Sequence, residues 1–194
     1  MKSMLFYSSL IMLFFFALAT KVTAQTEADM MKAWQEYMTP GDMHKVLASY
    51  EGEWTTEGKM WMDPNGQPMT STGSATYRMV LGGRYQETVF TGDMMGQQFE
   101  GKGLMGYDNF KKQFESTWVD NMGTGTMRTE GTYDPATKTF TMTGKMVDPM
   151  TRKECAIRET LKMVDQDTHV MTMYNSIAGA PEFKTMELTF KRKK

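Results

Sequence analysis

From Gly52 onward, apolar and polar residues alternate with a period of two, which is typical of β-strands that have one buried and one solvated face. In the first such segment, Trp54 and Met60 share one face, and charged residues occupy the other. Clusters of Asp, Pro, Asn and Gly separate the segments, as turns require. The pattern predicts ten strands, at residues 52–62, 69–80, 84–91, 97–107, 112–119, 125–133, 138–147, 153–164, 168–175 and 183–191.

Residues 25–51 lack this alternation and are rich in helix-forming residues. Thr26 resembles a helix N-cap, and the helical run stops at Pro40 and Gly41 because proline cannot continue a helix. Asp42 can cap a second short helix. Two short helices are therefore predicted ahead of the strands.

One short motif occurs twice, 26 residues apart: Tyr107-Asp108 corresponds to Tyr133-Asp134, and the Lys and Phe that follow correspond as well. An Asp side chain that follows a strand can accept hydrogen bonds from the backbone of its own turn. Each copy is therefore predicted to be a hairpin turn, and residues 148–153 supply a further one.

Ten strands joined by short turns would expose two edges if they formed an open sheet. Closure removes both edges, so the sequence predicts an all-β fold: an antiparallel up-and-down β-barrel of about ten strands with short N-terminal helices. These helices are expected to cover one mouth or to flank the wall. A barrel of this size leaves room inside for a ligand.

The N-terminus has the pattern of a secretory signal peptide: Lys2, then the apolar run from Met4 to Ala19, then the small-residue site Val22-Thr23-Ala24. Cleavage after Ala19 is a second possibility. The apolar run is too short to span a bilayer. The expected organisation is a signal peptide at 1–24, a helical segment at 25–51 and a barrel at 52–194, located in the periplasm or secreted, with no membrane anchor after cleavage.

Composition excludes several functions. The 194 residues have a net charge of −1 and no basic patch beyond the C-terminal "KRKK", which argues against nucleic-acid binding. The single cysteine, Cys155, leaves no intramolecular disulfide. No motif of a hydrolase, redox or phosphate-binding enzyme occurs, so no enzymatic activity is expected.

Four stretches, "GEWTTEGKMW", "LGGRYQETVFTG", "GQQFEGKGLMGYDNFKKQFESTWVDNMGTG" and "MELTFKRK", resemble the bacterial family called domain of unknown function 1579 (DUF1579) over about residues 42–192. That family looks related to the calycins, which include lipocalins, fatty-acid-binding proteins and haem-binding nitrobindins. The resemblance implies a calycin hallmark here: Gly52-Glu53-Trp54 on the first strand, covered by Arg192 or Lys191 through a cation–π contact. It implies no activity.

By the same resemblance, His169 is a candidate haem ligand, because nitrobindins bind haem through a histidine on a late strand. No other part of that site is recognisable, and a structural histidine at the mouth or in the core is the other interpretation. His44, in the second helix, is expected at the surface.

Methionine is unusually abundant, with 23 in the chain, mostly on the predicted inner faces. Methionine fills irregular cores, and its flexible thioether also suits an adaptable pocket for an apolar ligand. Copper(I) binding is a further alternative, because Met60 and Met62, and Met171 and Met173, are spaced as Met-x-Met pairs.

The alternation in "CAIRETLKM" predicts that Glu159 points inward among apolar residues, where a carboxyl is costly without a partner. Glu87 shares a face with Tyr85 and Val89 and is predicted to point inward too, which would form a carboxylate pair with Glu159. The "WVDNMGTG" stretch is either a turn or a ligand-facing mouth loop.

These patterns predict an exported barrel that binds a small, largely apolar molecule inside a cavity lined by methionines and aromatic rings. The residues expected to line the wall or make polar contacts are Trp54, Tyr77, Tyr107, Trp118, Glu159 and His169. The alternatives are haem or metal binding through His169 and the methionines, and a structural or interaction protein whose barrel is filled by its own side chains. No resident cofactor is predicted, and the oligomeric state stays open.

Overall fold

A computed structural model describes residues 27–94, 96–177 and 179–194. The predicted signal peptide and the Thr26 cap lie outside the described residues. The described elements are α1 (Glu27–Met38), α2 (Asp42–Ala48), β1 (Gly52–Met60), β2 (Met69–Val80), β3 (Tyr85–Met94), β4 (Gln97–Asp108), β5 (Gln113–Asp120), β6 (Met127–Asp134), β7 (Thr139–Val147), β8 (Glu154–Met163), β9 (Thr168–Ile177) and β10 (Phe183–Arg192).

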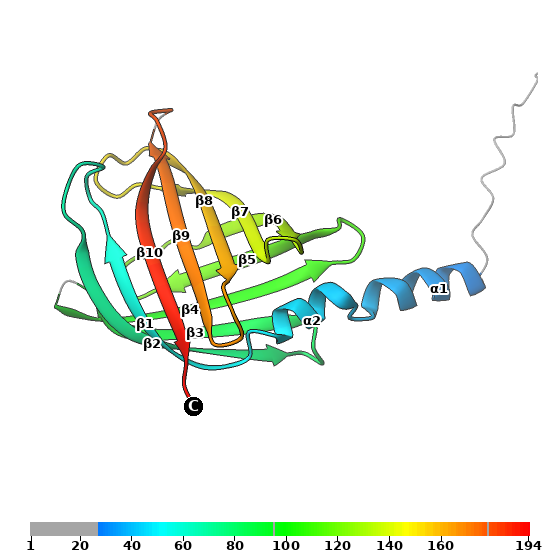
Figure 1. The fold of residues 1–194 in the computed structure, drawn as a ribbon. Coiled ribbons are helices and arrows are strands. Elements are labelled where there is room, and N and C mark those ends of the chain that lie inside the picture. The colour runs from blue at the N-terminus through cyan, green and yellow to red at the C-terminus, as the bar shows by residue number, and fades with distance from the viewer. Residues whose placement is uncertain (1–26, 95, 178) are drawn as a thin grey trace, which may run out of the picture.

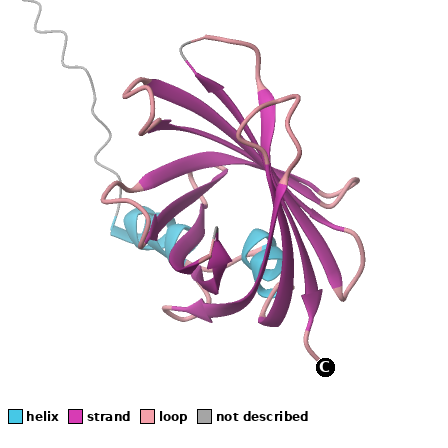
Figure 2. Cartoon of the chain, turned by 90° about the vertical axis from the view of Figure 1, so that its left-hand side faces the viewer, coloured by secondary structure: helices cyan, strands magenta, loops and turns pink. Residues whose placement is uncertain are grey.

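The strands form one closed antiparallel barrel in which each strand pairs with its neighbours in sequence (Figures 1 and 2). Closure comes from β1 and β10, whose register runs from Trp54 opposite Arg192 to Met60 opposite Met186. With β1 and β10 paired to each other, neither end of the strand order leaves an unpaired edge. The predicted fold class, an all-β up-and-down barrel, is confirmed.

The repeated motif is a hairpin turn, as predicted. Asp108 Oδ1 accepts hydrogen bonds from the backbone N–H groups of Phe110 and Lys111, at 2.7 and 2.8 Å. Asp134 binds its own turn in the same way, through the backbone of Ala136. Each turn closes on a residue with positive φ, at 57° for Lys112 and 53° for Lys138. These turns therefore set the hairpin geometry through local hydrogen bonds.

The predicted strand boundaries are correct to within about three residues, and one of the small differences is informative. The first strand ends at Met60 rather than at residue 62, so Met62 lies past the strand and is 67% exposed. The turn begins there because Asp63 Oδ1 accepts a hydrogen bond from the backbone of Asn65 at 2.7 Å. Met60 and Met62 therefore do not share an inner face.

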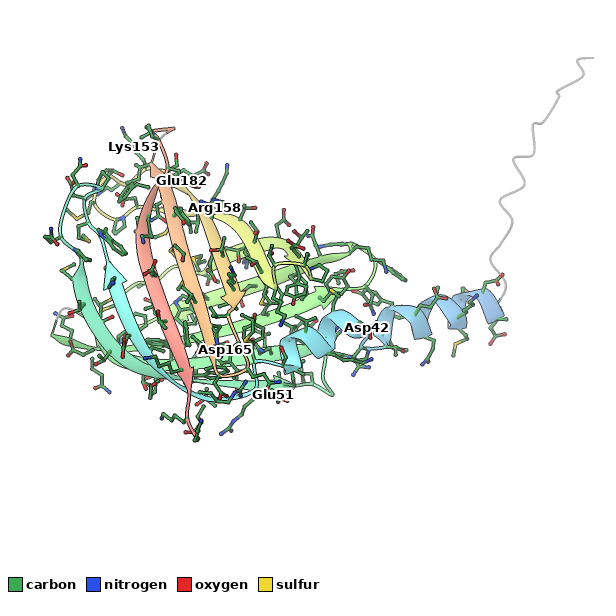
Figure 3. All side chains as sticks on the ribbon, viewed as in Figure 1. Asp42, Glu51, Lys153, Arg158, Asp165 and Glu182 are labelled. Carbon is green, nitrogen blue, oxygen red and sulfur yellow. The ribbon has the colours of Figure 1, made fainter. Side chains whose placement is uncertain are left out.

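Helix α2 covers one mouth of the barrel, which we call the α2 end (Figure 1). Leu47 and Tyr50, from α2 and the turn after it, are almost completely buried, and the Gln86 side chain on β3 donates to the Leu47 carbonyl at 2.6 Å. Figure 3 places the charged side chains of Glu51 and Asp165 at this end, and those of Lys153 and Glu182 at the opposite end.

Helix α1 projects from the α2 end and buries none of its residues (Figure 1). Its C-terminal turn is held by Asn109, whose side-chain amide donates to the carbonyls of Glu36, Tyr37 and Thr39 at 2.9–3.0 Å. The Tyr37 ring packs on Phe110 with their centroids 4.8 Å apart. This helix is attached to the outside of the barrel and does not reach its interior.

The C-terminal strand is locked to the first one by Arg192. Its guanidinium lies 4.1 Å from the centre of the Trp54 ring and donates hydrogen bonds to the carbonyls of Ser49, Glu51 and Gln166. Arg192 thus joins the end of α2, the start of β1 and the β8–β9 turn. Of the two cations expected to cover Trp54, the structure selects Arg192.

We expect Arg192→Ala to lower the free energy of unfolding by about 2–3 kcal/mol, because it removes a cation–π contact and leaves three carbonyls without their charged donor. Urea denaturation followed by tryptophan fluorescence measures the change. Lys191→Ala is the matched control: Lys191 is exposed, and its ion pair with Glu57 is long, at 3.9 Å. It should change stability by less than about 0.5 kcal/mol. Equal effects of the two variants would contradict this role of Arg192.

Candidate functional site

The interior at the α2 end is filled by a cluster of aromatic rings around His169. The His169 ring is stacked on Phe190 with centroids 4.3 Å apart and meets Trp54 edge-on at 4.3 Å. Tyr50 packs against it at 5.1 Å, and the Tyr77 hydroxyl is hydrogen-bonded to its Nε2 at 3.4 Å. His169 is 0% exposed. The cluster therefore closes this end of the barrel from inside.

Burial governs the chemistry of His169. It lowers the pKa of the imidazole to about 3, and the positive charge of Arg192 acts in the same direction. The ring is therefore neutral at physiological pH. Its Nδ1 has no hydrogen-bond partner among the described residues, yet the surrounding rings prevent solvent contact. This is the geometry of a core histidine, and no face of the ring is open to the interior.

Beyond the aromatic cluster, glycines on the inner faces make room for larger side chains. A Cβ placed on Gly101 of β4 would overlap the indole ring of Trp118, and one on Gly103 would press on the same ring. Trp118 therefore lies along the inner surface of β4, and its Nε1 donates to Asp120 at 3.0 Å. The tryptophan ring is therefore part of the inner wall.

Several inward side chains in the middle of strands remain partly exposed. On β8, Ile157 is buried while the next inward residue, Glu159, is not, and on β9, Met171 and Met173 are likewise partly exposed. In a closed barrel, the exposed surface of an inward side chain in the middle of a strand faces the lumen. The described side chains therefore leave part of the lumen unfilled.

Glu159 is the polar centre of this region. It lies opposite Met142 on β7 and opposite Met173 on β9, and directly paired residues point to the same face. Met142 belongs to the core, so Glu159 points inward, as the alternation predicts. Among the described residues, no hydrogen bond or ion pair reaches its carboxyl, and burial raises its pKa to about 7. Burial raises the pKa of Tyr77, and the negative charge of Glu159 raises that pKa further.

Two expectations from the sequence were wrong. Glu87 is exposed on the outer face, because Gln86, Thr88 and Phe90 form the inner face of β3. The inward polar residue there is Gln86, whose amide binds the α2 backbone, so Glu87 and Glu159 form no pair. His44 is buried rather than at the surface, because its ring packs edge-on against Tyr107 of β4, and its Nδ1 accepts the Gly41 N–H at 3.0 Å and so caps α2.

The six predicted site residues do not form one group. Trp54, Tyr77 and His169 meet in the aromatic cluster. Glu159 lies on the lumen side of that cluster and interacts electrostatically with Tyr77. Tyr107 packs elsewhere, against Phe114 on β5 and the His44 ring of α2. Trp118 lines the wall farther from α2, beside Asp120 at the end of β5.

The sequence analysis missed Tyr50 and Asn175. Tyr50 contacts Tyr77, Phe140 and His169, which lie on three separate strands, so its ring reaches across the mouth of the barrel. Its hydroxyl and the Asn175 Oδ1 are buried without a hydrogen-bond partner among the described residues. Asn175 lies two residues beyond Met173 on the same strand, so the two-residue alternation places it on the same inner face. That alternation could have identified it from the sequence.

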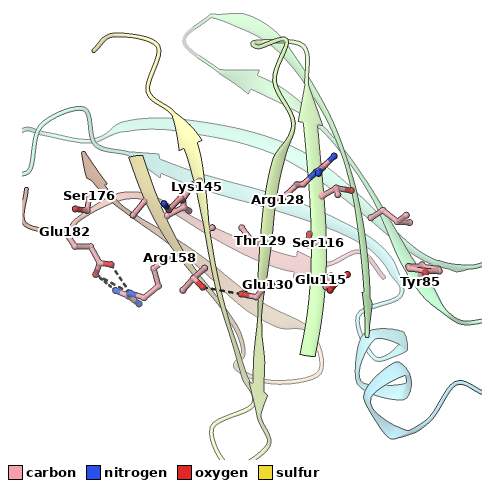
Figure 4. A pocket seen from close by; sticks show the side chains of 16 residues that line it. Tyr85, Glu115, Ser116, Arg128, Thr129, Glu130, Lys145, Arg158, Ser176 and Glu182 are labelled. Carbon is pink, nitrogen blue, oxygen red and sulfur yellow. Dashed lines mark hydrogen bonds and ion pairs between the residues drawn. The ribbon is translucent and has the colours of Figure 1, made fainter. Parts of the chain in front are cut away.

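A separate hollow of about 1020 Å³ lies on the outside of the barrel, across β3–β9 (Figure 4). Its charged residues include three acidic and three basic side chains, and Arg158 and Glu182 neutralise each other through hydrogen bonds of 2.6–3.2 Å. Outward-facing threonines such as Thr117 and Thr143 line its middle. The hollow is wide, and its balanced charge favours no ionic ligand.

Two further kinds of site were sought in the described part of the chain. No three His, Cys, Asp or Glu side chains there gather closely enough to hold a metal ion. No helix in residues 27–94, 96–177 or 179–194 is long and apolar enough to cross a bilayer.

Comparison with known proteins supports the fold. A family model described as "Protein of unknown function (DUF1579)" matches residues 39–192. Among solved structures, Rv2717c from M. tuberculosis has a TM-score of 0.61 and 15% sequence identity, over 80% of this chain and 100% of that chain. A redesigned β-barrel has a TM-score of 0.41 and 11% identity, over 77% of this chain and 96% of its own. No curated protein matches the chain.

We expect the pH dependence of stability to reveal Glu159. A carboxyl whose pKa rises from 4.5 to about 7 on folding stabilises the folded state fully below about pH 4.5, and this contribution is lost as the pH rises through 7. Glu159→Gln removes that loss. Between about pH 4.5 and 8, the variant should therefore gain about 2–3 kcal/mol relative to the unchanged protein.

Urea denaturation of both proteins across this pH range measures the effect. The pKa of His169 is also lowered, but this contribution is present in both proteins and cancels in the comparison. Glu87→Gln, on the outer face, is the control and should track the unchanged protein at every pH. Parallel curves for Glu159→Gln and the unchanged protein would show that the carboxyl is not desolvated.

Proposed function

Because the chain belongs to the DUF1579 family of proteins of unknown function, its role must be argued from its own barrel, and we propose that it binds a small, largely apolar molecule in the lumen. The observation that carries the proposal is the partly exposed ring of inward side chains at mid-barrel, with the unpartnered Glu159 carboxyl among them. A barrel that served only as a rigid body would gain stability by filling this space.

The lining suits an apolar ligand. The wall beside Glu159 carries the thioethers of Met142, Met171 and Met173, and the Trp118 ring lines another part of the wall on β5. Methionine side chains are flexible and polarisable, so they adapt to ligands of different shape without a large cost in packing. Gly101 and Gly103 keep the wall thin where Trp118 lies against it. The lumen is therefore matched to hydrophobic surface, with one polar anchor.

The alternatives gain less support. Haem ligation by His169 requires a ring nitrogen open to the lumen, but Phe190, Trp54 and Tyr50 enclose the ring, so this cluster would have to open first. Of the two Met-x-Met pairs that suggested copper binding, Met171 and Met173 share an inner face, whereas Met62 lies past the end of its strand and away from Met60. The filled-barrel alternative conflicts with the partial exposure at mid-strand.

Export is a second element of the proposal. The N-terminal pattern predicts cleavage after Ala24, so the barrel would meet its ligand in the periplasm or outside the cell. In those compartments an apolar molecule has no cytoplasmic carrier and gains most from a protein that shields it from water. The single cysteine, Cys155, is buried near the start of β8 and has no second cysteine in the chain to pair with, so the barrel does not depend on an internal disulfide.

We expect the protein, produced from the full chain with its export signal, to carry a bound molecule. Native and denaturing mass spectrometry of the same preparation would then differ by the mass of that ligand, and the difference would distinguish a lipid from haem or a metal. Identical masses, with no uptake after incubation with a lipid extract or haemin, would instead support the filled barrel.

We expect that filling the lumen by mutation blocks uptake. Met173→Trp adds bulk on the inner face of β9, whereas Thr172→Trp adds it to the outer face one residue away. Overpacking costs about 1–3 kcal/mol, which a stable barrel tolerates, and circular dichroism would verify the fold. The inner variant should lose at least about tenfold in affinity for a bound alkyl probe, and the outer variant less than about twofold. Equal affinities would place the ligand elsewhere.

A further inference from the structure

Glu159 is a negative charge in the lumen with no counter-ion from the described part of the protein. Basic side chains of β8 and of the neighbouring β7 form ion pairs on the outer face of the barrel. Arg158 binds Glu182, and Lys145 binds Glu154. The guanidinium of Arg192 stacks on Trp54 and donates hydrogen bonds to three backbone carbonyls at the α2 end, so it does not pair with Glu159. The interior is therefore negative when the Glu159 carboxyl is ionised.

A carboxyl enclosed by a protein wall is rarely left without a partner, because desolvation of the charge is costly unless hydrogen bonds or a cation compensate it. The residues that directly face Glu159 are Met142 and Met173, and neither can donate a hydrogen bond. Tyr77 lies close enough to interact electrostatically, but its hydroxyl is hydrogen-bonded to His169. Among the described residues, no group therefore compensates the charge of Glu159, and a ligand in the lumen can supply one.

A second buried acceptor lies on the neighbouring strand. Asn175 is two residues beyond Met173 on β9, so it shares the inner face with Glu159 and lies diagonally across the β8–β9 pair. Its Oδ1 is buried and has no hydrogen-bond partner among the described residues. Two acceptors without donors, one of them ionisable, together select a ligand group that is rich in hydrogen-bond donors and positively charged.

We propose that the lumen binds an amphiphile with a protonated primary amine, whose ammonium group donates hydrogen bonds to the Glu159 carboxylate and to Asn175 while its hydrocarbon part lies among the methionines. This inference rests on the proposed lumen-binding function and specifies its ligand class. An ammonium has three donors and no acceptor, which matches the two unpaired acceptors. A fatty acid would bring a second carboxylate to a lumen without a cation, where the two charges repel.

The test compares three probes with the same ten-carbon chain: decylamine, 1-decanol and decanoate. Isothermal titration at about pH 8.5 keeps Glu159 ionised and the amine protonated. Decylamine should bind at least about tenfold tighter than 1-decanol, and decanoate should bind weakest. In Glu159→Gln, the amine and the alcohol should bind with affinities within about twofold of each other.

Two further variants complete the design: a control on the outer face, and a second test inside the lumen. Glu130→Gln removes an exposed carboxyl on the outer face of β6 and should leave the preference for the amine unchanged. The comparison among the three probes on the unchanged protein needs no variant, so the inference can be tested even if Glu159→Gln does not fold. Asn175→Leu should weaken decylamine binding by about threefold to tenfold and leave 1-decanol binding unchanged.

The possible failures are distinguishable. If none of the three probes binds, lumen binding itself is wrong and the inference fails with it. If all three bind with similar affinity, or if decanoate binds tightest, the proposed function stands and the amine preference is overturned. A preference for decylamine that persists in Glu159→Gln would likewise overturn the role of this carboxyl.

Discussion

The structure depends on the closure of β1 against β10, because ten short-looped strands have no other means of pairing their two terminal edges. Arg192 fixes that closure by placing its guanidinium on Trp54 while its hydrogen bonds hold the backbone that leads from α2 into β1. The same contact brings Tyr50 over the mouth. The contacts of Arg192 therefore hold both the closed sheet and the segment that covers the mouth. Together, these two features determine which side chains lie inside the barrel.

The interior that results is divided in two. Near α2, the rings around His169 pack edge to face and leave no accessible surface on the imidazole. Farther along the barrel, methionines and glycines join the remaining aromatic rings on the inner face, and inward side chains such as Met171 and Met173 are partly exposed. The aromatic end supplies rigidity, and the methionine-lined region supplies adaptable space. Glu159 lies between them, where a polar ligand group would be fixed while an apolar remainder occupies the lumen.

The chain belongs to the DUF1579 family, and its likeness to the barrel of Rv2717c and the Arg192–Trp54 contact agree with a closed antiparallel barrel. The fold itself does not name a ligand, since similar barrels serve different chemistry. What distinguishes this chain is the content of its lumen: a carboxyl without a counter-ion among thioethers. The proposed function and the ligand class both follow from that content, and His169 contributes packing rather than an open binding group.

The sequence by itself determined the ten strands, their hairpin turns and the inward direction of Glu159, because each depends on local periodicity or on hydrogen bonds within a few residues. It did not determine the facing of Glu87 or the burial of His44. In β3 a polar residue, Gln86, occupies the inner face because the α2 backbone satisfies its amide, and His44 is buried because its ring packs on Tyr107 of β4. The role of Tyr50 and the enclosure of His169 likewise required tertiary structure, because their partners lie on strands far apart in the sequence and meet only when the barrel closes.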